Sequence, residues 1–244
     1  MNLCIDIGNT LVKLAIFNGQ GHLLERSHQK KASRKKLGFF LEKYKIKNAI
    51  LSSVRRKNAK LKRALAKVLN NFISLNATTK LPIDNRYATP KTLGRDRIAA
   101  VVGARSILGA TNILVIDAGT CLTCDFINKK GEYLGGSILP GVDMRYQALH
   151  QLTAELPKVQ RTQSNAFPFI GNSTETSIRT GVQLGIIHEI NGFIAHYQKY
   201  YPDLTLVLTG GDMPYFERHL KNEIVAVPDL VLIGLNQILN YNVS

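Results

Sequence analysis

Apolar and polar residues alternate in short runs over residues 3–27, which predicts three strands joined by two glycine-containing turns. The same arrangement recurs from residue 114, since LVIDAGTCLTCDFINKKGEYLGGS aligns with LCIDIGNTLVKLAIFNGQGHLLERS with one residue absent. Self-similarity of this kind indicates an internal duplication. We therefore predict two similar domains, 1–110 and 111–244.

Helical spacing of apolar residues follows each of these β-meanders. In the first half the pattern of apolar and polar residues predicts a helix at 34–45, a strand at 48–53, a basic helix from about 55, a strand at 72–75, a loop at 77–91 and a helix at about 95–108. In the second half the same kind of pattern predicts a helix at 141–152, a loop at 157–171, a helix at 174–199, a strand from 205 and a buried helix within 228–240. Asn172 and Glu175 have the spacing of a helix cap and its N3 partner. Meanders followed by helices, twice, predict an α/β protein with mixed sheets.

Positive charge is concentrated in one part of the chain, whose net charge is +15. Residues 26–70 hold 16 of the 32 Lys and Arg residues and one acid, Glu42. Such a segment could bind nucleic acid, or it could present solvated helix faces around a site for anionic ligands. In RRKNAKLKRALAKVL (55–69) the apolar residues lie at helical spacing, and no aromatic residues are interleaved with the basic ones. We favour the solvated faces and expect no nucleic-acid partner.

The three cysteines argue against a disulfide framework. Cys121 and Cys124 fall in a predicted strand, where positions three apart point to opposite faces, so they suit neither a redox pair nor a metal site. No apolar run approaches the roughly 18 to 20 residues of a membrane span, and the N-terminus lacks a signal-peptide pattern. We expect a cytoplasmic protein without membrane attachment.

A glycine-rich turn follows an aspartate in each meander. CIDIGNT (4–10) ends a strand at Asp6, and VIDAGT (115–120) ends one at Asp117. Gly-Asn alone indicates no more than a hairpin. Two equivalent turns, which would face one another across a cleft between the domains, favour a polyphosphate site. Glycine lets backbone N–H groups approach phosphate oxygens, and the carboxylates can hold the neutralising cation. Lys13 would add positive charge.

Other nucleotide-binding and hydrolase motifs are absent from the sequence, including the P-loop, G-x-G-x-x-G after a strand, G-x-S-x-G and H-E-x-x-H. The two turns resemble the phosphate turns of the acetate kinase, sugar kinase, Hsp70 and actin superfamily. DIGNT with Lys13, GRDR (94–97), DAGT (117–120), GGSILPG (135–141), Ser-Thr at 173–174 and TGGD (209–212) together resemble type III pantothenate kinase. The likeness spans residues 6–212, almost the whole chain.

The resemblance implies two similar ribonuclease H-like domains with mixed sheets flanked by helices, in the actin-like ATPase architecture. It implies ATP-dependent phosphorylation of pantothenate to 4'-phosphopantothenate, the first step of coenzyme A synthesis, with ATP, Mg²⁺ and K⁺ or NH₄⁺ as cofactors. It also implies a homodimer. The predicted 174–199 helix has more apolar positions than one buried stripe requires: Ile178, Val182, Ile186, Ile190 and Ile194.

The resemblance also assigns roles to individual residues. The ATP-phosphate loop corresponds to Asp6, Ile7, Gly8, Asn9, Thr10, Leu11, Val12 and Lys13. Thr120 matches a second ATP contact, and Asp117 matches the carboxylate that binds the monovalent cation. The pantothenate-binding residues correspond to Tyr87, Gly94, Arg95, Asp96 and Arg97, with Asp96 as the proton acceptor. Thr174 aligns with a substrate-contacting threonine, although Ser173 or Thr176 could take that role.

Asp96 has a structural interpretation as well, because the helix macrodipole favours an aspartate in the first turn of any helix. Aspartate in general, with a reference pKa of about 3.9, is a weak base at pH 7. Phosphoryl transfer has a loose transition state, so the acceptor hydroxyl can lose its proton late and positioning matters more than basicity. Two alternatives stay open: a regulator of the same fold that binds nucleic acid through residues 26–70, and a kinase acting on another small hydroxyl acceptor.

Overall fold

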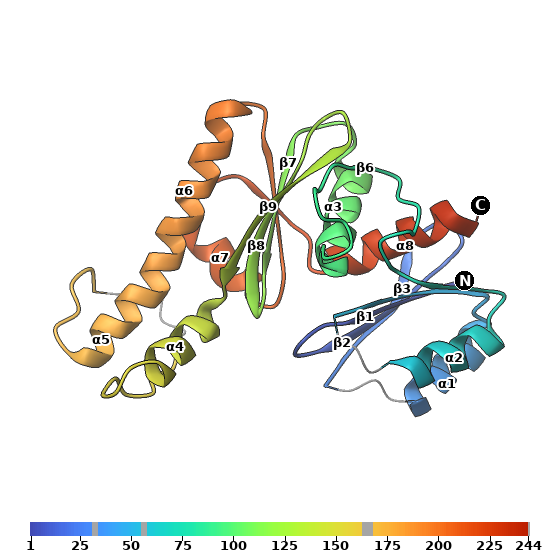
Figure 1. Cartoon of the computed structure of the whole chain (residues 1–244), viewed down its shortest axis with the longest axis horizontal. Helices are drawn as coiled ribbons and strands as arrows, with labels where there is room; N and C mark the ends of the chain where they lie inside the picture. The colour runs from blue at the N-terminus through green and yellow to red at the C-terminus, as the bar shows by residue number, and fades with distance from the viewer. Residues whose placement is uncertain (31–33, 55–57, 163–167, 244) are drawn as a thin grey trace. The chain divides into compact units, whose positions relative to one another are not determined.

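The computed structural model describes residues 1–30, 34–54, 58–162 and 168–243. Parts of the predicted basic surface (31–33 and 55–57) and of the predicted 157–171 loop (163–167) lie outside the described residues. Figure 1 shows the elements of the first half: β1 Asn2–Ile7, β2 Val12–Phe17, β3 Leu23–Gln29, α1 Arg34–Tyr44, β4 Asn48–Ser53, α2 Ala59–Val68, β5 Asn71–Ser74, β6 Asp84–Asn85 and α3 Arg95–Leu108. Those of the second half are β7 Ile113–Ala118, β8 Cys121–Ile127, β9 Glu132–Pro140, α4 Val142–Gln151, α5 Thr174–Arg179, the π-helical turn η1 Thr180–Leu184, α6 Gly185–Tyr200, β10 Thr205–Thr209, α7 Met213–His219, β11 Ile224–Ala226 and α8 Leu230–Val243.

The two sheets share one topology, except that the second has an additional edge strand, β6. The first has the strand order β3-β2-β1-β4-β5, and the second has the order β11-β10-β7-β8-β9-β6. In the first sheet the meander β1 to β3 is antiparallel, whereas β4 pairs parallel with β1 and β5 parallel with β4. In the second sheet β10 pairs parallel with β7 and β11 parallel with β10. The predicted α/β class with mixed sheets flanked by helices is confirmed.

The chain forms two compact units. Unit 1 comprises Met1–Ala110, Ile127–Gly135 and Asp229–Ser244, and unit 2 comprises Thr111–Phe126 and Gly136–Pro228. Each unit therefore contains one of the two aspartate-glycine turns. The predicted domain boundary between residues 110 and 111 stays a proposal, which limited proteolysis can test.

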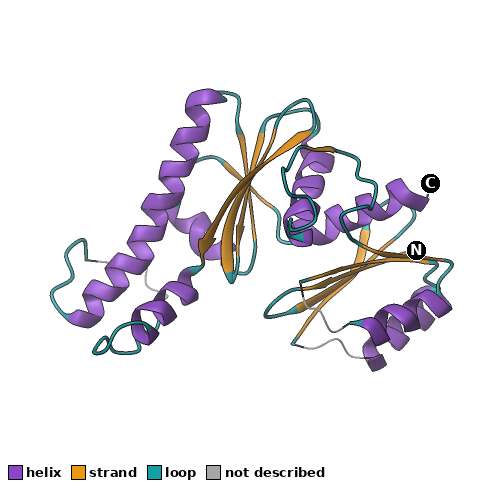
Figure 2. Cartoon of the chain, viewed as in Figure 1, coloured by secondary structure: helices purple, strands orange, loops and turns teal. Residues whose placement is uncertain are grey.

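In unit 1 helices cover both faces of the first sheet (Figure 2). Leu3, Ile5 and Ile7 of β1 pack into a core with residues of α1 and α2, including Phe40 and Leu65. Side chains alternate along a strand, so the intervening residues of β1 face the other side, towards α8. Polar residues at those positions can then point into the protein, which is the position that Asp6 occupies.

Helices α3 and α8 of unit 1 cross at two glycines. A Cβ added to Gly234 would lie 1.7 Å from the Ala99 carbonyl oxygen, and one added to Gly103 would lie 2.4 Å from the Leu230 carbonyl oxygen. Only glycine permits backbones to approach this closely. The crossing holds α3, and with it the GRDR motif at its start, against α8.

An asparagine ladder joins the edge of the first sheet to α8. The Asn71 amide donates to Asn48 at 2.9 Å, and the Asn48 amide donates to Asn2 at 3.1 Å. The Asn2 amide in turn donates to Asn236 at 2.8 Å and to Asn240 at 2.7 Å. Each buried amide thereby has a partner, which offsets the cost of its removal from water.

In unit 2, buried residues of α4, α6 and α7 share one core with residues of β7, β8 and β10. The predicted 174–199 helix is divided there into α5, the π-helical turn η1 and α6. Its five apolar positions are all buried in one core: Ile178, Val182, Ile186, Ile190 and Ile194. The inference that they exceed one stripe was therefore wrong, because at spacings of four residues they form that stripe.

The predicted cap of this helix is displaced by one residue. Ser173, not Asn172, is the N-cap: its Oγ accepts from the Thr176 N–H at 3.2 Å, and the Ser173 N–H donates to Thr176 Oγ1 at 2.9 Å. A threonine at N3 thus completes the capping box in place of the expected Glu175.

The predictions also missed β6, α7 and β11. These elements have two, seven and three residues, too few for periodicity to register. Within the described residues no helix is both long and apolar enough to cross a membrane.

Candidate active site

The first aspartate-glycine turn joins β1 to β2 as a tight hairpin. The Gly8 N–H donates to the Leu11 carbonyl at 3.0 Å, which closes the turn. Asn9 and Thr10 form its exposed tip, directly beyond the strand that carries Asp6. The predicted hairpin is confirmed, and the turn presents main chain and polar side chains of the kind that bind phosphate.

Strand pairing places four polar residues in one row across the first sheet. Asp6 of β1 pairs with Ser52 of β4 on one side and with Lys13 of β2 on the other, and Lys13 pairs with His28 of β3. The sequence interpretation contained Asp6 and Lys13 but missed Ser52 and His28. Their only sequence signal is a polar residue at the end of a predicted strand, and the register decides what lies beside it.

Asp6 is a buried carboxylate, 6% exposed. Burial raises its pKa to about 6, a hydrogen bond from Ser52 Oγ to Oδ1 at 3.0 Å opposes the rise, the charge of Asp96 adds to it, and Lys13 lowers it. The negative charge of Asp96 thus makes the ionised form of Asp6 less favourable. The sequence predicted roles for both residues, and the structure brings them into one electrostatic environment within unit 1.

The GRDR motif forms the N-terminus of α3. Gly94 is the N-cap, and a Cβ there would lie 2.6 Å from Asp96 Oδ1. The same oxygen accepts the Arg97 N–H at 2.9 Å. Glycine thus leaves room for the carboxylate to fold over the first turn, where the helix dipole favours its negative charge.

Arg97 and Tyr87 lie together beside this helix start. Arg97 is 6% exposed, and its guanidinium carbon lies 5.6 Å from the centre of the Tyr87 ring. Tyr87 stacks on Tyr133 with ring centres 6.0 Å apart, and Gly135 permits this because a Cβ there would approach the Tyr87 ring to 3.1 Å. Three predicted substrate-binding residues, including Asp96, are therefore neighbours in unit 1.

Arg95 has a different environment from its neighbours in the motif. Its guanidinium donates to the carbonyls of Leu93 at 3.0 Å, Pro90 at 3.3 Å and Lys91 at 3.3 Å. These bonds fold the preceding loop against α3. They give Arg95 a structural task in addition to the predicted contact with substrate.

The second aspartate-glycine turn joins β7 to β8 in unit 2. The Gly119 N–H donates to the Cys121 carbonyl at 3.0 Å, as Gly8 donates to Leu11 in the first turn. The second meander is one residue shorter than the first, and this difference therefore lies in the turn. Gly141 supports this turn from the end of β9, since its N–H donates to the Thr120 carbonyl at 3.2 Å and a Cβ would lie 2.3 Å from the Gly119 oxygen.

The TGGD motif packs on the same turn. Gly210 has a φ of 99°, and a Cβ there would lie 2.2 Å from the Ala118 oxygen and 2.6 Å from Asp117 Oδ1. The Asp212 N–H donates to the Ala118 carbonyl at 2.9 Å. The main chain of Gly210 thus lies directly against the Asp117 carboxylate. Three motifs far apart in sequence meet at this turn: DAGT, the end of GGSILPG, and TGGD.

Thr174 stands at the start of α5, also in unit 2. Ser173 and Thr176 hold each other in the capping box, whereas Thr174 is the exposed first residue of the helix and takes no part in the cap. Of the three hydroxyls that the sequence left as candidates for substrate contact, that of Thr174 alone is not used by the cap.

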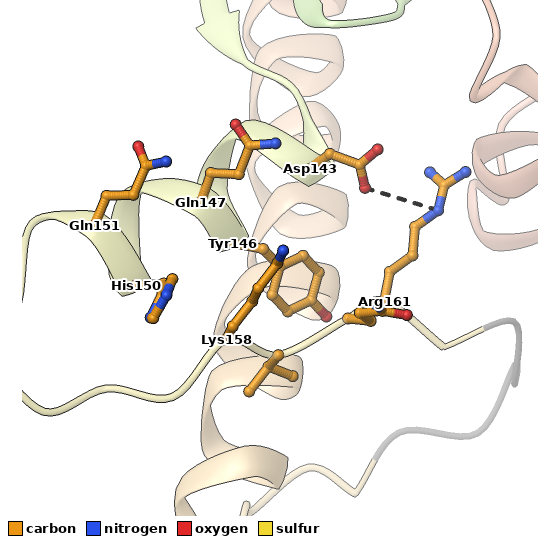
Figure 3. Close-up of a pocket in the computed structure, with 9 residues that line it drawn as sticks. Asp143, Tyr146, Gln147, His150, Gln151, Lys158 and Arg161 are labelled. Atoms are coloured by element: carbon orange, nitrogen blue, oxygen red, sulfur yellow. Dashed lines mark ion pairs between the residues drawn. The ribbon is translucent and has the colours of Figure 1, made fainter.

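A cavity of about 580 Å³ lies beside α4 in unit 2 (Figure 3). It is lined by Asp143, Tyr146, Gln147, His150, Gln151, Lys158, Val159, Gln160 and Arg161. The extended segment 158–161 forms one wall, and Arg161 reaches across so that its Nε lies 3.9 Å from Asp143 Oδ1 (Figure 3). No motif in the sequence pointed to this wall, because its residues are drawn together only by the packing of α4.

Among the residues that the structure describes, no group of three or more His, Cys, Asp or Glu side chains could hold a metal by itself. Mg²⁺ in phosphotransferases typically binds one or two carboxylates together with phosphate oxygens of the substrate. A buried aspartate beside a phosphate-type turn, with a second carboxylate nearby, fits that mode.

Comparison with known proteins agrees with these motifs. The family model described as type III pantothenate kinase matches residues 2–196. A type III pantothenate kinase from Phocaeicola vulgatus is 46% identical over 242 residues, covering 99% of each chain. One from Cytophaga hutchinsonii is 43% identical over 246 residues, covering 100% of each chain.

Solved structures share the fold at low sequence identity. The activator of 2-hydroxyisocaproyl-CoA dehydratase from Clostridium difficile, solved with bound ADPNP, has a TM-score of 0.56 and 12% identity, covering 99% of this chain and 93% of that one. A glucokinase from an Antarctic psychrotroph has a TM-score of 0.53 and 14% identity, covering 98% of each chain. These matches confirm the predicted actin-like ATPase and sugar kinase architecture. Since the family match spans most of the chain and the relatives align along its full length, the chain belongs to the type III pantothenate kinase family.

Proposed function

We propose that the protein transfers the γ-phosphoryl group of ATP to the primary hydroxyl of pantothenate, which yields 4'-phosphopantothenate and ADP. The observation that carries the proposal is that Asp6, buried at a phosphate-type turn in unit 1, lies close enough to the start of α3 to feel the charge of Asp96. Membership of a family of phosphotransferases supports the reaction class. A cytoplasmic location, expected from the sequence, accords with the use of ATP.

ATP would bind through backbone and polar groups of both turns. The proposed contacts in unit 1 are Asp6, Ile7, Gly8, Asn9, Thr10, Leu11, Val12 and Lys13, and the proposed contact in unit 2 is Thr120. Backbone N–H groups of the turns would hold phosphate oxygens, and the Lys13 ammonium would contribute charge. The close packing of Gly210 and Gly141 against the second turn supports this role, because it keeps the main chain of the turn in one conformation.

Two cations would complete the site. Mg²⁺, held by Asp6 and phosphate oxygens, would neutralise the charge that develops on the transferring group. K⁺ or NH₄⁺ would sit beside Asp117, where Gly210 lies against both the Asp117 carboxylate and the Ala118 carbonyl oxygen. Hard cations prefer oxygen ligands of this kind.

Pantothenate would bind beside the start of α3 through Tyr87, Gly94, Arg95, Asp96 and Arg97. Asp96 accepts the hydroxyl proton as the pantothenate oxygen forms its bond to the γ-phosphorus and the bond from that phosphorus to the bridging oxygen of ADP breaks. The buried Arg97 guanidinium suits the carboxylate of the substrate or the transferring phosphoryl group.

A homodimer would add Thr174 to the substrate site. The buried stripe of the long helix no longer supports a dimer, but unit 2 exposes other large apolar side chains, with Leu152 83%, Phe169 81% and Ile170 74% exposed. Exposed apolar groups of this size are typical of association surfaces. Sedimentation as a monomer at assay concentration would contradict this part of the proposal.

Purified protein given ATP, Mg²⁺, K⁺ and pantothenate should form phosphopantothenate. Asp96→Asn should lower kcat by about 10² to 10⁴, the usual contribution of a positioned base, with ATP affinity retained. Asp203→Asn, which removes the same charge from an exposed loop, is the matched control and should leave turnover unchanged. Folded protein that turns over another hydroxyl acceptor but not pantothenate would refute the substrate, and folded protein without any kinase activity would refute the reaction.

A further inference from the structure

The position of the second phosphate-type turn depends on the segment that ends β10. The Asp212 N–H donates to the Ala118 carbonyl at 2.9 Å, and Gly210 lies against Asp117 and Ala118 too closely for any side chain. A displacement of residues 210–212 would therefore move the Asp117 carboxylate or open space beside it. Whatever holds Asp212 in place also holds this turn.

The Asp212 side chain is held by Arg161. Arg161 Nη1 lies 2.5 Å from Asp212 Oδ1, and the side chains are 34% and 15% exposed. Asp143 of α4 lies farther from the same guanidinium, at 3.9 Å, and is 69% exposed. The pair with Asp212 is thus the shorter and the more buried of the two.

Arg161 itself is anchored on both sides along the chain. Thr162 donates its N–H to Gln183 Oε1 at 3.1 Å and accepts from Gln183 Nε2 at 3.2 Å. Gln160 accepts at its carbonyl from Arg179 Nε at 3.3 Å. Gln183 is fully buried in the π-helical turn η1, a conformation that often occurs at functional sites. The guanidinium is therefore presented from a backbone that cannot easily shift.

We propose that Arg161 is a positioning residue for phosphoryl transfer. Its ion pair with Asp212 holds residues 210–212 against Ala118, and this contact sets the position of the Asp117–Thr120 turn. Arg161 is not proposed to touch ATP or pantothenate. The kinetic consequence rests on the proposed function, whereas the structural consequence does not.

The pair is partly exposed, and such pairs contribute little to global stability. Variants at Arg161 should therefore fold, and their effects should appear at the turn. Misplacement of a positioned group by about 1 Å can cost as much as 10²-fold in rate. We expect Arg161→Met to lower kcat/KM for ATP by at least about tenfold and to raise the K⁺ concentration needed for half-maximal activity, with KM for pantothenate unchanged.

The experiment compares Arg161→Met, Asp212→Asn, the double variant and Arg161→Lys in the full-length protein. Asp212→Asn should reproduce the effect of Arg161→Met, the double variant should be no worse than the worse single variant, and Arg161→Lys should restore part of the activity. Arg218→Met is the matched control, since Arg218 is an exposed arginine on the adjacent helix α7 whose Nε bonds within that helix, to Pro214 O at 2.9 Å.

Hydrogen exchange of the free protein tests the same idea without turnover. In Arg161→Met the amides of Gly119 and Asp212 should exchange about two- to fivefold faster than in wild type, the effect expected for the loss of a partly exposed ion pair, while those in the middle of β7 should not change. Unchanged exchange at Gly119 and Asp212, or additive kinetic losses in the double variant, would overturn the proposal. If wild type fails to phosphorylate pantothenate, the proposed function is refuted and the exchange result alone decides the role of Arg161.

Discussion

Replacing Asp6 by asparagine should make the free protein more stable and abolish its activity. Asp6 is 6% exposed, and burial raises its pKa to about 6 from the ordinary value of 3.8. The folded protein therefore binds the Asp6 proton more tightly than the unfolded chain between about pH 4 and pH 6. Above about pH 6 the ionised Asp6 side chain lowers the free energy of unfolding, whereas below about pH 4 the protonated side chain does not.

The size of the effect follows from the two pKa values. At about 1.36 kcal/mol per pH unit, linkage gives a cost of about 1 kcal/mol at pH 4.5 and about 3 kcal/mol at pH 7.5. The asparagine side chain in the variant carries no charge, and its Oδ1 can still accept the hydrogen bond from Ser52. The free energy of unfolding of Asp6→Asn should therefore exceed that of wild type, and the excess should be about 2 kcal/mol larger at pH 7.5 than at pH 4.5.

Urea denaturation followed by circular dichroism measures this difference, with EDTA present so that no divalent cation binds. Hydrogen exchange of the β1 amides localises the effect to unit 1. Glu155→Gln, a change of the same kind at an exposed position, should show no such trend. A difference in unfolding free energy between Asp6→Asn and wild type that does not change with pH would refute the argument that Asp6 is held ionised at a cost.

Two further predictions concern the scaffold of unit 1. Gly234→Ala should lower the free energy of unfolding by about 3 kcal/mol or more, because a Cβ would lie 1.7 Å from the Ala99 oxygen and force α3 and α8 apart. Gly192→Ala is the control, since a Cβ at this position on α6 would have no atom within 4 Å, and it should be neutral or stabilising in the same urea titration. Asn2→Ala should cost about 2 to 3 kcal/mol, because it removes the hydrogen bond to Asn236, which is 1% exposed. Asn71→Ala, at the exposed end of the ladder, should cost less than about 1 kcal/mol, and equal losses at the two positions would contradict the ladder's dependence on burial.

Much of the fold could be predicted because its signals are local. The alternation in β1 and β2, the glycine of each turn and the helical spacing in α3 depend on neighbouring residues, so the duplicated meander, the α/β class and the order of the longer elements were correct. The same holds for the site motifs, which lie at the ends of predicted elements. Recognition of the family depended on these motifs occurring in one order, and the comparisons confirm it.

Errors in the prediction arose where hydrogen-bond geometry, or a contact with a distant segment, decides where an element begins or ends. The cap of α5 lies at Ser173 because Thr176 can return a hydrogen bond to it, and the choice between Ser173 and Asn172 depends on geometry that spacing does not encode. The break of the long helix at η1 has a similar origin, since Gln183 there bonds the backbone of Thr162, far away in the chain. Short elements such as β11 exist because β10 offers them an edge.

The amino-acid sequence specifies that Asp6 and Asp117 lie at equivalent glycine turns, because strand periodicity and turn chemistry act over a few residues. It does not specify that Ser52 lies beside Asp6, that burial raises the pKa of Asp6, or that Arg161 forms an ion pair with Asp212; these follow from the packing of the folded chain. Register, burial and ion pairing are properties of segments brought together by packing. Desolvation and Coulomb interactions depend on distance in space, which no spacing along the chain specifies.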